Sequence, residues 1–278
     1  MLDDELRSGN GPDYWNSIGA TWSRNPQLLW REHSDAVNCA LLARWIPERG
    51  ADCALKTDMF DEMCSAGLYP FLALRARRFV GIDMSVSVLR SAKSRHAGIH
   101  AVAADARQLP FAGEMYDLIV SNSTLDHFES VDEIRKALAE LLRVLRPEGE
   151  LIITMDNPEN PIIALRNALP FRLFNRLGIT PYYVGATLNA RELRLLLEET
   201  GFRVMESASI MHCPRVFAVA LANLLQRYAP SWMQQGFLRS LMAFEHLGRL
   251  PSHRLTSHFT AARATKAGPS LDETTKKE

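Results

Sequence analysis

Several turns of the sequence carry side chains that could bind a ligand or move a proton. Each follows a short apolar run that predicts a β-strand. LKTDMFDE begins at Leu55, Asp83 closes FVGID, Asp105 closes IHAVAAD, and NSTLDHF contains Asp126 and His127. Carboxylates and hydroxyls accept hydrogen bonds from a ligand, and an imidazole exchanges protons near neutral pH. We therefore expect ligand chemistry at these turns.

Strands and helices alternate through the first half of the chain. The apolar runs predict strands at 53–55, 79–82, 99–103, 116–121 and 150–155, and helices at 26–46, 65–77, 85–96 and 132–145. This alternation favours a parallel sheet with helices on both faces. Ligands bind such sheets beyond the carboxyl ends of the strands. The turns at 56–62, 83–85, 105–111, 121–128 and 156–161 should therefore form the site.

The second half of the chain adds two insertions to this pattern. NARELRLLLEETGF predicts a helix that ends at Gly201, FRVMESASI predicts a strand, and LTSHFTAARAT predicts a last strand. We expect a helical and aromatic N-terminal segment over the site (1–49), a cofactor-binding core (50–156) and a lid insertion (157–188). A core helix and strand (189–211), a helical insertion (212–252), a last core strand (253–266) and a flexible tail (267–278) should follow.

Composition narrows the class of protein. The chain has 278 residues, 47% of them hydrophobic, and a formal net charge of zero, so no global charge favours nucleic acid. The four cysteines show no CxxC pair and no zinc-like spacing, which predicts buried thiols, no metal site and a reducing cytoplasm. We recognise no signal peptide and no apolar run of about 18 residues or more, the length that a membrane-spanning helix needs.

Three motifs occur in a distinctive order. VGIDMSVSVLRSA is followed by AADARQLPFAGEMYDLIVSNSTLDHF and then by ELLRVLRPEGELIIT. This series resembles the class I S-adenosylmethionine-dependent methyltransferases, in particular the type 11-like group, over about residues 50 to 155. The resemblance implies a Rossmann-like α/β fold with a seven-stranded, mainly parallel sheet and helical insertions. It also implies S-adenosyl-L-methionine as cofactor.

The resemblance gives the end of the second strand a role in binding adenosine. Asp83 would accept hydrogen bonds from the ribose hydroxyls, as an acid does in dinucleotide folds. Met84 would pack on the adenine face. From the residues alone, Asp83 could instead cap the helix near Ser85, and Met84 could simply fill the core.

The third and fourth strands would complete the cofactor site. Asp105 would accept the adenine amino group, and the backbone of Ala106 would meet a ring nitrogen. Ser121 and Asn122 would lie beside the reacting sulfur. The open alternative for Asp105 is a solvated turn acid, because Asp is common in turns.

The first turn departs from the family pattern. There the family has an acid followed by glycines, whereas this chain has Lys56 at the acid's position and Asp58, Phe60 and Glu62 at the glycine positions. Lysine is the wrong charge beside a cationic ammonium and sulfonium. Either Lys56 turns away and pairs with nearby acids, or the acids of this turn, Asp61 included, replace the lost negative charge. We count Lys56 and Asp58 among the cofactor-binding candidates.

The substrate end draws on the fourth turn and on the insertions. His127 and Asp126 are the catalytic candidates, since methyl transfer depends mainly on positioning and needs a base only where the acceptor loses a proton. His127 could also be a capping or packing residue. The candidates for the acceptor pocket are Tyr182, Tyr183, His212 and Arg215.

Positive charge gathers on the two insertions. Four arginines and no acid lie between Glu159 and Glu192. Between Glu206 and the last strand there are five arginines and one acid, Glu245. Both segments are also apolar, which suits a lid over a greasy acceptor or peripheral contact with an anionic membrane. The alternative is helices that pack on the core with solvated arginines.

The leading hypothesis is a methyltransferase that acts on a small-molecule or lipid-like acceptor. The alternative is a non-catalytic, methyltransferase-like protein that binds a ligand or partner, which the glycine-free turn motivates. A nicotinamide enzyme ranks last, because LKTDMFDE cannot form a glycine-rich pyrophosphate turn. Nucleic acid is not an expected partner, since the core shows no basic stripe with interleaved aromatics.

Overall fold

The structure is a computed structural model that describes residues 11–24, 26–169 and 182–267. Parts of three predicted segments lie outside those residues: the first ten positions, residues 170–181 of the lid insertion and the tail from 268 onward. Arg172 and Arg176 are among them. The predicted division of the chain into core and insertions remains a prediction.

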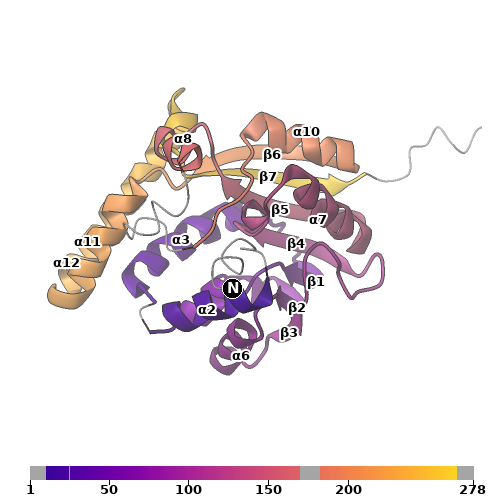
Figure 1. The fold of residues 1–278 in the computed structure, drawn as a ribbon, viewed down its shortest axis with the longest axis horizontal. Coiled ribbons are helices and arrows are strands. Elements are labelled where there is room, and N and C mark those ends of the chain that lie inside the picture. The colour runs from indigo at the N-terminus through magenta and orange to yellow at the C-terminus, as the bar shows by residue number, and fades with distance from the viewer. Residues whose placement is uncertain (1–10, 25, 170–181, 268–278) are drawn as a thin grey trace, which may run out of the picture.

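Seven strands form a single sheet (Figure 1). They are β1 (Ala51–Lys56), β2 (Ala76–Asp83), β3 (His100–Ala103), β4 (Tyr116–Asn122), β5 (Leu145–Asp156), β6 (Phe202–Ile210) and β7 (Phe259–Lys266). Their order is β3-β2-β1-β4-β5-β7-β6, and β7 alone runs antiparallel to its neighbours. This confirms the predicted Rossmann-like, mainly parallel sheet.

Helices cover both faces of the sheet. They are α2 (Pro12–Trp22), α3 (Leu28–Trp45), α4 (Phe60–Cys64), α5 (Tyr69–Ala73), α6 (Val86–Arg95), α7 (Val131–Val144), α8 (Pro161–Ala168), α10 (Ala190–Thr200), α11 (Arg215–Tyr228), α12 (Ser231–Ala243) and α13 (His253–Thr256), with 3-10 turns η1 (Leu125–His127) and η2 (Phe244–Arg249). Ala54 and Ile152 pack in one apolar cluster with α3, α5 and α11, whereas Leu55 and Ile153 pack in a second cluster with α7 and α10. Successive strand side chains point to opposite faces, so each strand supplies two cores.

Local signals account for the helices that the sequence predicted well. Ser130 caps α7 by accepting a hydrogen bond from the Glu133 backbone. Asn189 and Glu192 form a capping box at the start of α10, and Gly201 ends that helix in the left-handed conformation.

The helix predicted at 65–77 is wrong. Only α5 falls within that range, because α4 ends before it at Cys64 and β2 begins at Ala76. Gly67 has a φ of +61°, which no helix continues through, and Pro70 in the first turn of α5 suits a new helix start. Within the N-terminal segment predicted as helical and aromatic, α2 lies around Trp15, outside the helix predicted at 26–46.

The topology leaves the carboxyl ends of β1, β2 and β4 side by side at one edge of the sheet. β1 is central and pairs in parallel with both β2 and β4. The helices α2 and α3 and the segment from Tyr182 onward approach that edge. Within the described ranges, no helix is both long enough and apolar enough to cross a bilayer.

Candidate cofactor and acceptor site

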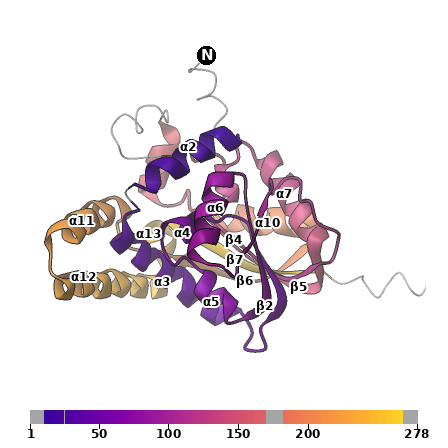
Figure 2. The ribbon, with the colours of Figure 1, turned by 90° about the horizontal axis from the view of Figure 1, so that it is seen from below.

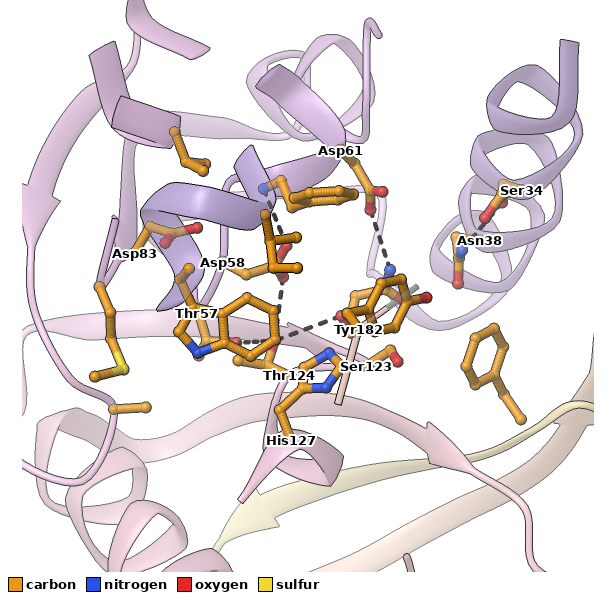
Figure 3. A pocket seen from close by; sticks show the side chains of 18 of the residues that line it. Ser34, Asn38, Thr57, Asp58, Asp61, Asp83, Ser123, Thr124, His127 and Tyr182 are labelled. Atoms are coloured by element: carbon orange, nitrogen blue, oxygen red, sulfur yellow. Dashed lines mark hydrogen bonds between the residues drawn. The ribbon is translucent and has the colours of Figure 1, made fainter. Parts of the chain in front are cut away.

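A pocket opens at the carboxyl edge of the sheet, where the expected turns meet (Figure 3). Eight predicted site residues line it: Asp58, Asp83, Met84, Ala106, Asn122, His127, Tyr182 and Arg215. Six others do not: Lys56, Asp105, Ser121, Asp126, Tyr183 and His212. The pocket therefore gathers residues from strands, turns and both insertions.

The second turn holds Asp83 through two backbone donors. One carboxylate oxygen accepts the Ser85 backbone N–H at 2.8 Å, and the other accepts the Met59 N–H at 3.1 Å. Burial raises the pKa of Asp83 to about 6, although the two backbone donors act in the opposite direction. Ser85, and not Asp83, caps α6 by accepting from the Val88 N–H. Each Asp83 oxygen keeps acceptor capacity for a hydroxyl in the pocket.

Apolar side chains surround this end of the pocket. Met84, Val88, Ala104 and Ala106 line it and could enclose a flat ring. Asp105 lies beside them but is held by the guanidinium of Arg107, with Nη2 2.6 Å from Oδ2. Sequence reasoning did not identify this ion pair.

The first turn is built around a buried lysine. Lys56 is completely buried, and its Nζ donates to the Asp58 carbonyl at 2.9 Å and to Glu62 Oε2 at 3.0 Å. Burial alone would lower the pKa of Lys56, but Asp58 and Glu62 outweigh it and raise the pKa. Burial raises the pKa of Glu62 to about 7, against the opposing effect of Lys56. Lys56 thus turns away from the pocket and pairs with acids of its own turn.

Two glycines outside the turn make room for its side chains. A Cβ at Gly67 would lie 2.7 Å from the Glu62 carboxyl carbon, and one at Gly81 in β2 would lie 2.1 Å from Met59 Sδ. Glu62 also accepts the Leu68 backbone N–H at 3.0 Å, and both Glu62 and Met59 are fully buried. Glu62 and Met59 are thus directed away from the pocket, whereas Asp58 and Phe60, at the other two glycine positions, line it.

Acidic groups of the first turn still face the pocket. Asp61 pairs with Arg31 of α3, and Asn122 Nδ2 donates to the other Asp61 oxygen at 3.4 Å. Asp58 accepts from Thr124 Oγ1 at 3.1 Å, as the dashed lines in Figure 3 show. Both carboxylates line the pocket, so the negative charge missing at Lys56 is present a few residues later.

The fourth turn presents His127 but not Asp126. His127 Nδ1 lies 2.8 Å from the Tyr183 carbonyl, and its ring packs against Trp15 at 4.8 Å. Asp126 is fully buried and accepts the Asp156 N–H and the Ser123 hydroxyl. Ser121 is also fully buried, 3.0 Å from Thr57 Oγ1, beneath the pocket floor.

The far end of the pocket is aromatic and carries a buried arginine. Arg215 Nη2 donates to the Tyr182 hydroxyl at 2.8 Å, and Nη1 lies 2.5 Å from His258 Nε2. Burial lowers the pKa of His258, so we take this ring as neutral. His212 instead lies beneath η2 and contacts Thr256 Oγ1 at 2.8 Å. Tyr183 contributes its backbone, which donates to the Tyr14 hydroxyl.

Sequence reasoning missed most of the apolar lining. The additional lining residues include Trp15, Ile18, Trp30, Phe60, Met211 and Phe259. The aromatic segment before and within α3 signalled a cover over the site, but nothing marked Met211 or Phe259, which reach the pocket from the far end of the sheet.

Part of the chain matches a known family. Residues 63–153 match the family described as "Methyltransferase domain". The match begins immediately after the glycine-free first turn and covers the second, third and fourth turns. The first turn, which Lys56, Met59 and Glu62 organise, lies outside the matched residues.

Relatives share parts of the chain. The demethylmenaquinone methyltransferase of Renibacterium salmoninarum is 39% identical over 74 residues, which are 27% of this chain and 30% of that protein. The enzyme of the same name from Thermobifida fusca is 37% identical over 146 residues, 51% of this chain and 56% of that protein. The chain thus spans about a third and about half of these relatives.

Solved structures share the fold. Phosphoethanolamine N-methyltransferase 2 from Haemonchus contortus, in complex with S-adenosyl-L-methionine, has a TM-score of 0.53 at 18% identity and covers 83% of this chain and 52% of its own. The [4+2]-cyclase SpnF has a TM-score of 0.50 at 18% identity, with coverage of 83% and 80%. The family match over residues 63–153 and the shared fold support the resemblance to the class I S-adenosylmethionine-dependent methyltransferases that the motifs predicted.

Proposed function

We propose that this protein transfers a methyl group from S-adenosylmethionine to a small-molecule or lipid-like acceptor. The observation that carries the proposal is the arrangement of Asp83. Its carboxylate is held by two backbone donors at one end of a pocket whose other end is aromatic. A polar nucleoside end and an apolar acceptor end are what such a transfer requires.

The residues of the pocket fit the cofactor. Asp83 would accept the ribose hydroxyls, and Met84 with Ala106 would enclose the adenine. Asp58 and Asp61 would face the cationic ammonium and sulfonium as acceptors, although each also pairs with a cation of the protein, Lys56 and Arg31 respectively. Glu62 is the second acid that pairs with Lys56. When bound, S-adenosylmethionine supplies an electrophilic methyl group. The side chains of the chain itself must then orient the acceptor and remove any proton that it loses.

His127 is the candidate base. With Nδ1 donating to the Tyr183 carbonyl, Nε2 keeps its lone pair and can accept a proton from an acceptor in the pocket. The rings of Trp15 and Tyr182 pack on the imidazole and limit its orientations. Asp126, buried below, would act by holding the η1 turn in place and not by contact with the substrate.

The acceptor end suits an apolar molecule with an electron-rich oxygen. Trp30, Tyr182 and Phe259 offer aromatic surface. Arg215 hydrogen-bonds Tyr182 and His258, and the buried Asp156 carboxylate nearby offsets part of its charge. At the pocket it would still donate a hydrogen bond to a partly negative oxygen. The names of the relatives, which include a demethylmenaquinone methyltransferase, support a lipid-like acceptor.

The test is label transfer from methyl-labelled S-adenosylmethionine to extractable acceptors. A reduced demethylated naphthoquinone, a simple phenol and a fatty acid serve as probes. We expect label in at least one organic extract, with a large loss in Asp83→Ala and in His127→Ala. Cofactor binding without transfer to any probe would instead favour the non-catalytic alternative, and loss of label in neither variant would contradict the assigned roles.

A further inference from the structure

The outward face of α11 is apolar although it lies in solvent. Phe217, Leu221, Leu224 and Tyr228 follow one another at helical spacing, and Phe217 and Tyr228 are 73% and 72% exposed. The inward face is apolar too, with Ala218 and Ala222 buried against the core. A helix that is apolar all round is usually enclosed by protein or lipid. The described part of the chain covers only one side of this one.

The neighbouring helix α12 exposes large apolar side chains only near its start. α11 and α12 form a hairpin that projects from the side of the sheet (Figure 2). In α12, Trp232 and Met233 are exposed beside the turn, whereas the exposed positions further along include Gln235, Arg239 and Ser240, and Leu241 is buried. The exposed large apolar residues of the hairpin are therefore those of α11 and of the start of α12.

The tip of the hairpin carries aromatic and basic groups. Trp232 is 73% exposed and follows Tyr228 across the turn. Arg227 and Arg239 are exposed, and neither is within ion-pair distance of an acid among the described residues. The acid of this segment, Glu245, is turned inward, where it accepts the Met211 and His212 N–H groups. The surface around the stripe is thus basic.

We propose that the outward face of α11 and the hairpin tip bind the surface of an anionic phospholipid bilayer. Aliphatic side chains enter the acyl boundary, Tyr and Trp favour the interface, and arginines are attracted to anionic headgroups. The first residue of α11, Arg215, reaches into the pocket. Docking by this helix would place the pocket near the bilayer, which suits the lipid-like acceptor proposed above but does not depend on catalysis.

Vesicle sedimentation tests the proposal with the full chain. We expect sedimentation with vesicles of phosphatidylcholine and phosphatidylglycerol, and much less with phosphatidylcholine alone or at high salt. Phe217→Gln/Leu221→Gln/Leu224→Gln should weaken the partition about tenfold or more. The matched control, Gln235→Ala/Ser240→Ala on α12, should bind as the wild type does.

Tryptophan fluorescence gives a second readout that needs no triple variant. Of the five tryptophans, Trp22, Trp30 and Trp45 are buried and Trp15 is half-buried, whereas Trp232 is exposed. Brominated lipids in anionic vesicles should quench the wild-type emission, and Trp232→Phe should remove most of that quenching. Circular dichroism checks that both variants are folded.

Three outcomes would overturn the proposal. One is no sedimentation with anionic vesicles by the folded wild type. Another is equal binding by the α11 triple variant and the wild type. The third is a dimer in light scattering that the α11 variant dissociates, with no vesicle binding, because a second copy of the chain would then cover this face.

Discussion

The turns after β1 and β2 lie side by side in one pocket and are built in opposite ways. The second turn holds an acid, Asp83, through two backbone N–H groups. The first contains no glycine and instead buries Lys56 and Glu62 as an ion pair. The family match includes the second turn and begins just after the first. Both turns nevertheless contribute pocket walls, with Asp58 from one and Asp83 from the other.

The difference shows that a turn can leave room for a ligand without glycines of its own. Here Met59 and Glu62 are drawn inward, and the space they need is provided by Gly67 and Gly81, while Asp58 and Phe60 line the pocket. Inspection of the turn alone would suggest a lost site. From the packing around the turn we propose a rebuilt one.

The largest expected effect comes from removing the buried cation. Lys56→Met leaves Glu62 buried without its partner, so we expect the free energy of unfolding to fall by about 3–5 kcal/mol. Urea denaturation followed by circular dichroism measures it. Lys56→Met/Glu62→Gln should recover most of the loss, because a glutamine oxygen can still accept the Leu68 N–H. A double variant no more stable than the single one would contradict the pairing.

Loss of the Asp83 charge should weaken cofactor binding, and it should also cost stability, because asparagine can accept only one of the two backbone N–H groups. Hydrogen bonds to a charged group are worth about 1.5–3 kcal/mol, so Asp83→Asn should raise the Kd of S-adenosylhomocysteine about 10- to 100-fold. Calorimetric titration at fixed pH measures this Kd. An unchanged Kd would remove Asp83 from the site and leave the second turn without its assigned role.

Because Asp83 changes its protonation state near pH 6, the affinity for the cofactor should depend on pH. Burial raises the pKa of Asp83 to about 6, so below that pH the free protein carries a neutral acid there. Ribose hydroxyls favour the ionised form, so affinity should rise as the pH increases through 6 and then level off. Calorimetric titrations at several pH values should show this rise in the wild type and a much flatter profile in Asp83→Asn. A wild-type affinity profile as flat as that of Asp83→Asn would mean that protonation of Asp83 does not control the affinity.

Substitution of a glycine that packs against the first turn should cost more stability than substitution of a glycine in open space. Gly67→Ala adds a Cβ 2.7 Å from the Glu62 carboxyl carbon at a φ of +61°, so we expect a loss of about 1–3 kcal/mol in stability. Gly236→Ala, in open space within α12, should instead be neutral or slightly stabilising. Thermal denaturation of both variants gives the comparison. Equal effects would mean that Gly67 makes no special room for Glu62.

The smallest effect should come from Ser85, which caps the helix α6 after the second turn. Ser85→Ala removes the acceptor for the Val88 N–H and should cost about 1 kcal/mol in stability. Since the Ser85 N–H that Asp83 accepts is backbone, cofactor affinity should change little. A large loss of affinity would show that the cap, and not the backbone, orients the acid.

The sequence was sufficient for the parts that local signals determine. Apolar runs marked the strands, and helical periodicity marked α7 and α10, whose caps at Ser130 and Asn189 the structure adds. It failed at 65–77, where a left-handed glycine lies inside the apparent helix and only the short α5 forms. Such short helices depend on their neighbours more than on their own residues.

The candidate site likewise contains residues that the sequence could place and residues that it could not. Asp83 and Asn122 could be placed because they end strands whose direction the pattern gives. The inward turn of Lys56 depends on Glu62 and on two distant glycines, so the first turn alone left both alternatives open. Trp30 and Phe259 line the same pocket from positions 229 residues apart in the sequence (259 − 30), which local patterns do not bring together.

The central claim is that the first turn is a rebuilt cofactor site. The most direct test is a calorimetric titration of S-adenosylhomocysteine into the folded wild-type protein. This account predicts saturable binding with a micromolar Kd and one site per chain. No heat of binding, in a protein whose circular dichroism shows it to be folded, would mean that the glycine-free turn has closed the site and would contradict the account.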